Sequence, residues 1–198
     1  MSYYICVLDF EATCWPDRRD DNMREIIEFP SILYKVNSVV QKGGTKVEYI
    51  GEFQKYVKPV LHPILTDFCT ELTGITQDIV DKASTFEQVY LEHYEWLRSY
   101  VDINEKLIFA TCGRWDLRDM LPIEINRNSK LELYHCYTKY VDIKGEFAKC
   151  FGQYCGGMAN MLKKLKIKLT GKHHSGIDDC RNLSKIIIKM IEESHKFV

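Results

Sequence analysis

The segment VLDFEAT, residues 7–13, places two acidic side chains at the end of a strongly β-forming run. Residues 3–8, YYICVL, are aromatic, aliphatic or Cys, which predicts a buried strand. Successive side chains of a strand point to opposite faces, so Asp9 and Glu11 should share one face. Two like charges in one place need a cation, a shared proton or full solvation, because burying unpaired charge is costly. The pair therefore predicts either a metal or acid–base site, or the frayed and solvated end of an edge strand.

Length and composition favour one soluble domain. A chain of 198 residues with 45% hydrophobic and 12% aromatic residues can bury a substantial core, so we expect a single domain over 1–198. The formal net charge of −1 argues against a generally basic nucleic-acid binder and leaves room for a local basic patch. The eight cysteines are dispersed without a Cys-x-x-Cys pair, and neither a signal peptide nor a membrane span is evident. We expect a reduced, intracellular protein without membrane contact, cytoplasmic with the nucleus left open.

Strand patterns come first along the chain, and helix and strand patterns alternate after them. Residues 30–40 and 47–59 predict a hairpin around the turn-forming QKGGTK at 41–46. Helices are expected at 66–74, 85–101, 115–121, 156–167 and 177–194, and a further strand at 106–112. In the second of these helices the apolar positions 86, 89, 90, 94, 97, 100 and 101 follow helical spacing. This order predicts an α/β fold with a mixed central β-sheet flanked by helices.

Further candidate site residues lie in two later segments. Asp116 follows the strand expected at 106–112 and should lie near its carboxyl end, where α/β folds place their sites; a helix-capping or first-turn acid is the alternative. His174 and Asp179 open the last helix within HHSGIDDCRN, residues 173–182, where a glycine between them lets the chain turn. An exposed histidine pair followed by ordinary N-terminal acids is the alternative there. Four acids and one histidine on three segments together favour one site over coincidence.

Asp9, Glu11, Asp116, His174 and Asp179 occur in the order and context of the DEDDh exonucleases, the 3'-5' exonucleases of the ribonuclease H-like superfamily whose last motif carries a histidine. The chain resembles their Eri1-like subgroup, which includes the three-prime histone mRNA exonuclease. Four stretches carry this resemblance: EIIEFPSI (25–32), YVKPVLHPILTDFCTELTGIT (56–76), FATCGRWDLRDML (109–121) and HSGIDDCRN (174–182). The similarity extends over nearly the whole chain.

The resemblance implies a metal-dependent phosphodiester hydrolase. It implies two Mg²⁺ ions, with Mn²⁺ as the alternative, bound by Asp9, Glu11 and Asp179, with Asp9 bridging and Asp116 contributing directly or through water. Carboxylate oxygens are the ligands that Mg²⁺ prefers, which suits four acids. His174 is implied as the general base that takes a proton from the attacking water, and Glu11 is placed with it among the catalytic residues. The expected products are a nucleoside 5'-monophosphate and a strand shortened by one nucleotide.

An enzyme that cuts only the last linkage must recognise the end of a chain. In the family resembled, backbone groups just after the first motif, here Ala12 and Thr13, lie against the terminal sugar. Apolar side chains near LTGIT, residues 72–76, hold the terminal base in that family, which nominates Leu72 and Ile75, with core packing as their alternative. The implied substrate-binding residues are Glu11, Ala12, Thr13, Leu72, Ile75 and His174. Glu28 is assigned a structural hydrogen-bonding role outside the site.

The implied substrate is single-stranded RNA or a 3' overhang. A DNA-directed exonuclease of the same branch is the alternative. The metal-binding residues do not indicate whether the sugar is ribose or deoxyribose, because RNA recognition depends on contacts to the 2'-hydroxyl. A catalytically inactive nucleic-acid-binding module is the alternative from another class. The chain has no length to spare for an additional nucleic-acid-binding or zinc domain, so we expect a protein partner to target it.

Overall fold

A mixed β-sheet forms the centre of the computed structural model, which describes residues 2–17, 21–38, 45–102 and 105–197. Its strands follow the order β2-β3-β1-β5-β6, and β4 pairs with the other edge of β3. β3 runs antiparallel to β1, β2 and β4, whereas β1, β5 and β6 are parallel to one another. The strands are β1 (Ser2–Leu8), β2 (Glu11–Ala12), β3 (Ile26–Ser38), β4 (Thr45–Tyr56), β5 (Leu107–Thr111) and β6 (Tyr140–Asp142). The predicted mixed sheet is confirmed.

The hairpin predicted from two strand patterns is formed by β3 and β4. Its turn at 41–46 lies largely outside the described residues. β3 begins four residues earlier than expected, because β1 and β2 both pair with it, one after the other along a single edge. The chain leaving β1 therefore stays beside β3 while it passes through Asp9 and Phe10.

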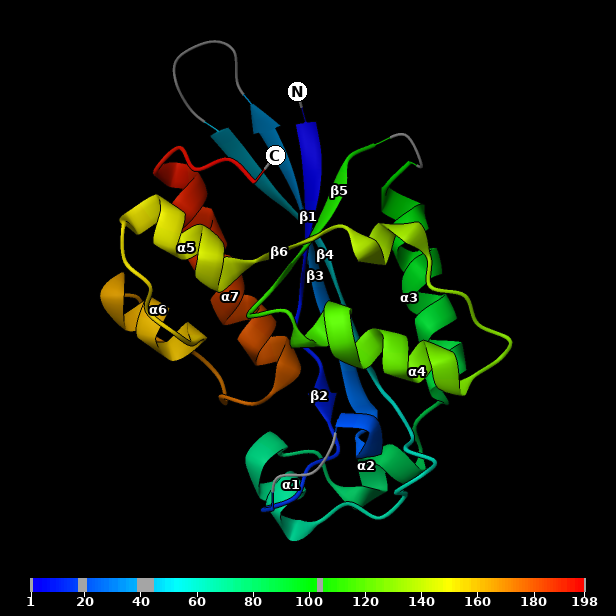
Figure 1. Ribbon diagram of the computed structural model, residues 1–198. Coiled ribbons are helices and arrows are strands. Elements are labelled where there is room, and N and C mark those ends of the chain that lie inside the picture. Colours follow the sequence, from blue (N-terminus) through cyan, green and yellow to red (C-terminus); the bar gives the residue numbers. More distant parts are fainter. Residues whose placement is uncertain (1, 18–20, 39–44, 103–104, 198) are drawn as a thin grey trace.

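Helices cover both faces of the sheet (Figure 1). They are α1 (Asp67–Thr73), α2 (Gln77–Asp81), α3 (Phe86–Tyr100), α4 (Leu121–Arg127), α5 (Ile143–Phe151), α6 (Met158–Lys164) and α7 (Gly176–Glu192). α3 and α4 lie on one side, α5, α6 and α7 on the other, and α1 and α2 lie below the sheet near β2. The side chains of β1 alternate accordingly: Tyr4, Cys6 and Leu8 join the cluster with α3, and Tyr3, Ile5 and Val7 join the cluster with α7.

Capping residues set several helix ends. The Thr66 hydroxyl accepts a hydrogen bond from the Cys69 N–H at the start of α1, and Gly74 ends that helix with a positive φ of 82°. The helix expected from residue 115 instead begins as a π-helical turn, Trp115–Met120, that continues into α4. Four short elements, β2, β6, α2 and α5, were not predicted from the sequence.

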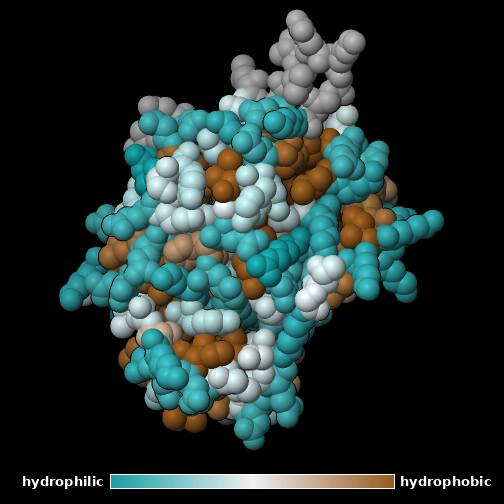
Figure 2. All heavy atoms as spheres, turned by 180° about the vertical axis from the view of Figure 1, so that it is seen from behind, coloured by the Kyte–Doolittle hydropathy of each residue, from teal (hydrophilic) through white to brown (hydrophobic). Residues whose placement is uncertain are grey.

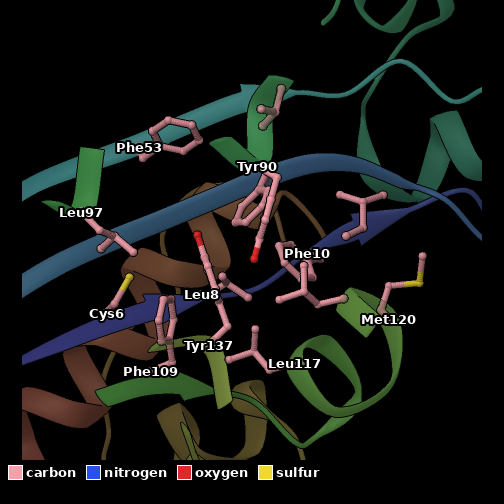
Figure 3. Close-up of a cluster of buried hydrophobic side chains, with 14 of the residues drawn as sticks. Cys6, Leu8, Phe10, Phe53, Tyr90, Leu97, Phe109, Leu117, Met120 and Tyr137 are labelled. Atoms are coloured by element: carbon pink, nitrogen blue, oxygen red, sulfur yellow. The ribbon is translucent and has the colours of Figure 1, made fainter. Parts of the chain in front are cut away.

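The larger aromatic residues pack between α3 and the sheet. Figure 3 shows Tyr90 and Tyr137 facing one another there, and their ring centroids lie 5.2 Å apart. His93 is completely buried in the same region, with one ring nitrogen 2.8 Å from the Ser31 hydroxyl and the other 2.7 Å from the Tyr137 hydroxyl. The apolar face predicted for α3 was wrong at Tyr100, which is 46% exposed. The buried face of the helix includes His93 instead.

The surface has apolar side chains exposed at the end that carries α1. Figure 2 shows brown spheres gathered at the lower end of the molecule. The segment just before and within α1 exposes Val60, Leu61, Ile64 and Phe68. Within the described ranges, none of the helices combines the length and the apolar character that crossing a membrane would require.

Candidate active site

Asp9 and Glu11 lie at the junction between β1 and β2. Their side chains lie close together, as predicted from the alternation of side chains along a strand. Glu11 pairs with Glu28 of the neighbouring β3 and is buried. The carboxylates of Asp9, Glu11 and Asp179 each offer an oxygen within 4.8 Å of the others. The third of these acids belongs to the first turn of α7, so the cluster joins the beginning of the chain to its last helix. In Figure 1 the start of α7 meets the end of β1 beside the turn that leads into α4.

Asp116 reaches the same region from β5. Because β1 and β5 are parallel, with Val7 opposite Ala110, the segments that follow the two strands leave the sheet at the same edge. The Asp116 carboxylate is buried and accepts a hydrogen bond of 2.9 Å from the Phe10 N–H, between the two acids of the first motif. It is outside the group of three acids described above, which suits a contribution through water as well as a direct one.

The loop before α7 places His173 and His174 next to Asp179. The His174 N–H donates to Asp179 Oδ2 at 2.9 Å, and His174 takes a positive φ of 66°. The neighbouring His173 places Nδ1 3.0–3.1 Å from both oxygens of Asp179, and its ring stacks on that of His174 at 4.0 Å. Both imidazoles, Asp9 and Asp179 line one cavity of about 280 Å³.

Gly176 allows the final helix to approach the sheet closely. A Cβ on this residue would lie 2.7 Å from the Asp9 carbonyl oxygen and 2.7 Å from Pro30 Cγ. Its N–H donates to Glu28 Oε2 at 2.9 Å, which fixes the start of α7 against β3. The expectation that this glycine lets the chain turn is wrong, because the left-handed residue is His174 and the need at Gly176 is for space. The structural role predicted for Glu28 is confirmed.

The acids of the cluster carry more negative charge than their surroundings neutralise. Burial, and then repulsion from Asp116 and Glu11, raise the pKa of Asp9 well above its ordinary value. Burial and the neighbouring carboxylates raise the pKa of Glu11 to about 9. Burial raises the pKa of Asp116 to about 6, with the hydrogen bond from Phe10 opposing the shift. In the described parts of the chain no Lys or Arg forms an ion pair with these acids, so a bound cation would relieve their repulsion.

The predicted sugar- and base-contacting residues lie beside the acids but differ in accessibility. The Thr13 N–H and hydroxyl are both bonded to the backbone of Glu25, and the Ala12 carbonyl accepts a weak bond from Cys69 Sγ. Ile75 is 3% exposed and packs in the small core cluster under α1, the alternative left open for it, whereas Leu72 is half-buried.

Two lysines also lie near the site, and the first of them, Lys144, was not selected from the sequence. The Lys144 ammonium lies close to Gly113 and lowers the pKa of Asp116, opposing the effect of burial. The Lys172 ammonium donates to the Glu71 carbonyl at 2.9 Å and so ties the loop that carries His174 to α1. Lys144 has no sequence signal of its own, because Asp116 is distant along the chain, whereas Lys172 ends the lysine-rich run at 163–172.

Comparisons with known proteins agree with this geometry. A model of the exonuclease family, RNase_T, matches residues 6–187. ERI1 exoribonuclease 3 of Mus musculus is 39% identical over 188 residues, which cover 93% of this chain and 52% of the relative. The chain thus spans about half the length of this curated relative.

Two solved structures superpose closely on the chain. The nuclease domain of 3'hExo, a DEDDh family member bound to rAMP, has a TM-score of 0.86 at 33% identity, covering 97% of this chain and 93% of that one. A second structure, of the 3'-end-specific recognition of histone mRNA stem-loop by 3'-exonuclease, also has a TM-score of 0.86, at 32% identity, covering 97% of this chain and 83% of that one.

The fold and the acid cluster define a ribonuclease H-like nuclease of the metal-dependent DEDDh type. The chain belongs to the exonuclease family, and within it to the Eri1-like subgroup of 3'-5' exonucleases.

Proposed function

We propose that this protein is a 3'-5' exoribonuclease that removes nucleoside 5'-monophosphates from the 3' end of single-stranded RNA or of a 3' overhang. The observation that carries the proposal is the convergence of Asp9, Glu11 and Asp179, with oxygens within 4.8 Å of one another, beside Asp116 and His174. An inactive binding module has no need for so costly an arrangement of buried acids.

The donor set fits hard divalent cations. We infer that Asp9, Glu11 and Asp179 hold two Mg²⁺ or Mn²⁺ ions, with Asp116 assisting directly or through water, because the three clustered side chains offer only oxygen ligands. When bound, such ions supply charge that stabilises the attacking and leaving oxygens of a phosphodiester. The carboxylates would fix the positions of the ions, and the hydrogen bond from the Phe10 N–H orients the Asp116 carboxylate toward them.

His174 is suited to accept a proton from water. Burial lowers the pKa of its imidazole, and His173 adds to the effect, so the ring is neutral and basic at physiological pH. Its backbone N–H is held by Asp179, which fixes the ring beside the acids. Glu11 serves both the metal site and the contact with substrate.

The preference for RNA rests on relatives of this chain. ERI1 exoribonuclease 3 is named for action on RNA, and the two superposed structures concern rAMP and a histone mRNA stem-loop. We extend this substrate class to the present chain, with Ala12, Thr13 and Leu72 placed at the terminal nucleotide. DNA is the alternative substrate. Residues 1–198 act as one exonuclease domain in this proposal, and a separate protein targets it to particular RNAs.

A reducing intracellular compartment suits the same proposal. All eight cysteines are free thiols, although Cys14 and Cys69 lie in one core cluster. Fluorescence microscopy of the tagged chain in its own cells would test the compartment, and a secreted or membrane-enclosed signal would contradict it.

The decisive experiment is degradation of 5'-labelled single-stranded RNA, and of DNA of the same sequence, with Mg²⁺ or Mn²⁺ and with EDTA. We expect a metal-dependent ladder that shortens from the 3' end, faster for RNA. A faster DNA ladder would select the DNA-directed enzyme, and binding without degradation of either strand would select the inactive module.

Two variants assign the roles in that assay. Asp179→Ala should abolish the ladder and weaken metal binding. His174→Ala should retain the binding of Mg²⁺ or Mn²⁺, measured by calorimetry, and lose at least about 100-fold in rate, the usual contribution of a general base. Parental rates in a folded Asp179→Ala variant would refute the metal site, and a collapse of metal affinity in His174→Ala would make that residue a ligand instead.

A further inference from the structure

A second group of metal-binding side chains overlaps the acid cluster. His173, His174 and Asp179 each offer a ligand atom within 4.8 Å of the other two. This group contains two imidazoles and one carboxylate, whereas Asp9, Glu11 and Asp179 offer oxygen alone. The two groups share Asp179, so an ion held by one competes for that residue with an ion held by the other.

The chemistry of the second group differs from that of the first. Imidazole nitrogen is a poor ligand for Mg²⁺ and a preferred ligand for Zn²⁺, which commonly takes three protein ligands and a water in tetrahedral geometry. Zn²⁺ ligands about 2.0–2.1 Å from the metal lie about 3.3 Å from each other in a tetrahedron. His173 Nδ1 lies 3.0 and 3.1 Å from the oxygens of Asp179, which is close to that spacing.

The surroundings leave this group accessible and oriented. The His173 side chain is 44% exposed, and the cavity that both histidines line leaves room for a water ligand. Asp179 is held by the His174 N–H, a contact of the kind that orients carboxylate ligands around a metal. The two rings stack at 4.0 Å with their planes 15° apart, which keeps both imidazoles close together, and one ring must rotate out of the stack for both nitrogens to bind one ion.

We propose that His173, His174 and Asp179 form an inhibitory Zn²⁺ site that disables the nuclease by occupying its general base and one of its metal-binding acids. Binding replaces the hydrogen bond between His173 Nδ1 and Asp179 by the ion: the Nδ1 proton moves through water to Nε2, and the imidazole binds as the neutral tautomer with its Nδ1 lone pair on Zn²⁺. The inhibition rests on the proposed exonuclease function, whereas the zinc site itself does not. His173 is the residue that separates the zinc site from the nuclease site. It belongs to the zinc-binding group and lies outside the acid cluster, and, unlike His174, it has no part in the proposed reaction.

The binding test uses the metal alone. The full chain is freed of metal, and its affinity for Zn²⁺ is measured by competition with a chromophoric chelator, with Co²⁺ absorption as a second report of tetrahedral geometry. His173→Gln should weaken the tightest Zn²⁺ binding by about tenfold or more and remove the tetrahedral Co²⁺ bands. The matched control is His135→Gln, an exposed histidine remote from the site, which should bind as the parent does. Thermal unfolding verifies that each variant is folded.

The inhibition test adds a Zn²⁺ series to the RNA assay at fixed Mg²⁺, with every rate divided by the zinc-free rate of the same variant. The half-inhibitory Zn²⁺ concentration should rise about tenfold or more in His173→Gln, stay unchanged in His135→Gln, and rise in the parent as Mg²⁺ is increased. Equal zinc affinity and equal inhibition in His173→Gln and the parent would overturn the proposal. If the parent degrades no RNA, the exonuclease function fails, and the binding test still decides the zinc site.

Discussion

Glu11 shows at the scale of one residue how the clustering of buried acids opposes stability. Its carboxylate is buried beside other acids, and its pKa is raised to about 9. A raised pKa in the folded protein means that the folded state holds the proton more tightly than the unfolded state does. The stability that protonated Glu11 contributes is therefore present at acidic pH and lost as the pH rises toward about 9.

We predict that Glu11→Gln stabilises the metal-free protein at alkaline pH. The variant should unfold at nearly the same temperature as the parent near pH 5, where the group is protonated in the folded state, and at a higher temperature near pH 9. A gain of about 3 °C corresponds to roughly 1 kcal/mol in a chain of this size. Thermal unfolding in EDTA across this pH range measures the difference. A constant difference at all pH values would contradict the assigned shift.

The individual acids could be selected from the sequence, but their neighbours could not. Asp9 and Glu11 follow from the alternation of one strand, and Asp116 and Asp179 from motif context. His93 could not be interpreted from the sequence in this way. Nothing in a helical pattern indicates that its two ring nitrogens will contact the hydroxyls of Ser31 and Tyr137. His173 was read only as part of an exposed pair, since its contact with Asp179 depends on the conformation of the loop.

At the scale of elements, the site depends on how closely α7 approaches β1 and β3. Helix α7 packs most of one face against the sheet, and its first residue, Gly176, contacts the Asp9 backbone. The strong helical pattern at 177–194 predicted the helix from the sequence. The distance between α7 and the sheet was not predictable from that pattern, because it depends on residue 176 being a glycine, which has no side chain.

We predict that Gly176→Ala loses nuclease activity by about 100-fold, because the added Cβ pushes Asp179 away from Asp9 and geometry of this kind tolerates little displacement. The melting temperature should fall as well. Gly145→Ala is the matched control, since its Cβ meets nothing within 4 Å and alanine favours the interior of α5. It should retain activity and unfold at the same or a higher temperature. Full activity in Gly176→Ala would show that the site tolerates a wider gap.

The short elements explain most of the remaining differences between sequence and structure. β2 has two residues and β6 has three, too few for a recognisable alternation. A helix was expected at 115–121, but the sequence pattern does not distinguish the π-helical turn found at Trp115–Met120, which places Asp116 against Phe10. Such elements form because long neighbours, here β3 and β5, supply the hydrogen-bonding partners.

At the scale of the molecule, metal binding and folding are coupled. The clustered acids come from both ends of the chain, so a preformed site exists only in the folded state. A ligand that binds the folded state alone stabilises it by an amount that rises with the logarithm of its concentration relative to its dissociation constant.

We predict that Mn²⁺ or Mg²⁺ raises the melting temperature of the parent, by about 5 °C or more at 100 times the dissociation constant. Asp179→Ala should show a much smaller rise, because it lacks one of the shared ligands. Differential scanning calorimetry with a metal series measures both. An equal rise in the two proteins would place the stabilising ions elsewhere on the surface.

The contact between Asp9 and Asp179 also determines when the acid cluster can form during synthesis. The ribosome adds Asp9 about 170 residues before Asp179, and the pairing of β1 with β5 cannot supply the carboxylate that α7 carries. A nascent chain therefore has no complete acid cluster until α7 has left the exit tunnel and docked on the sheet.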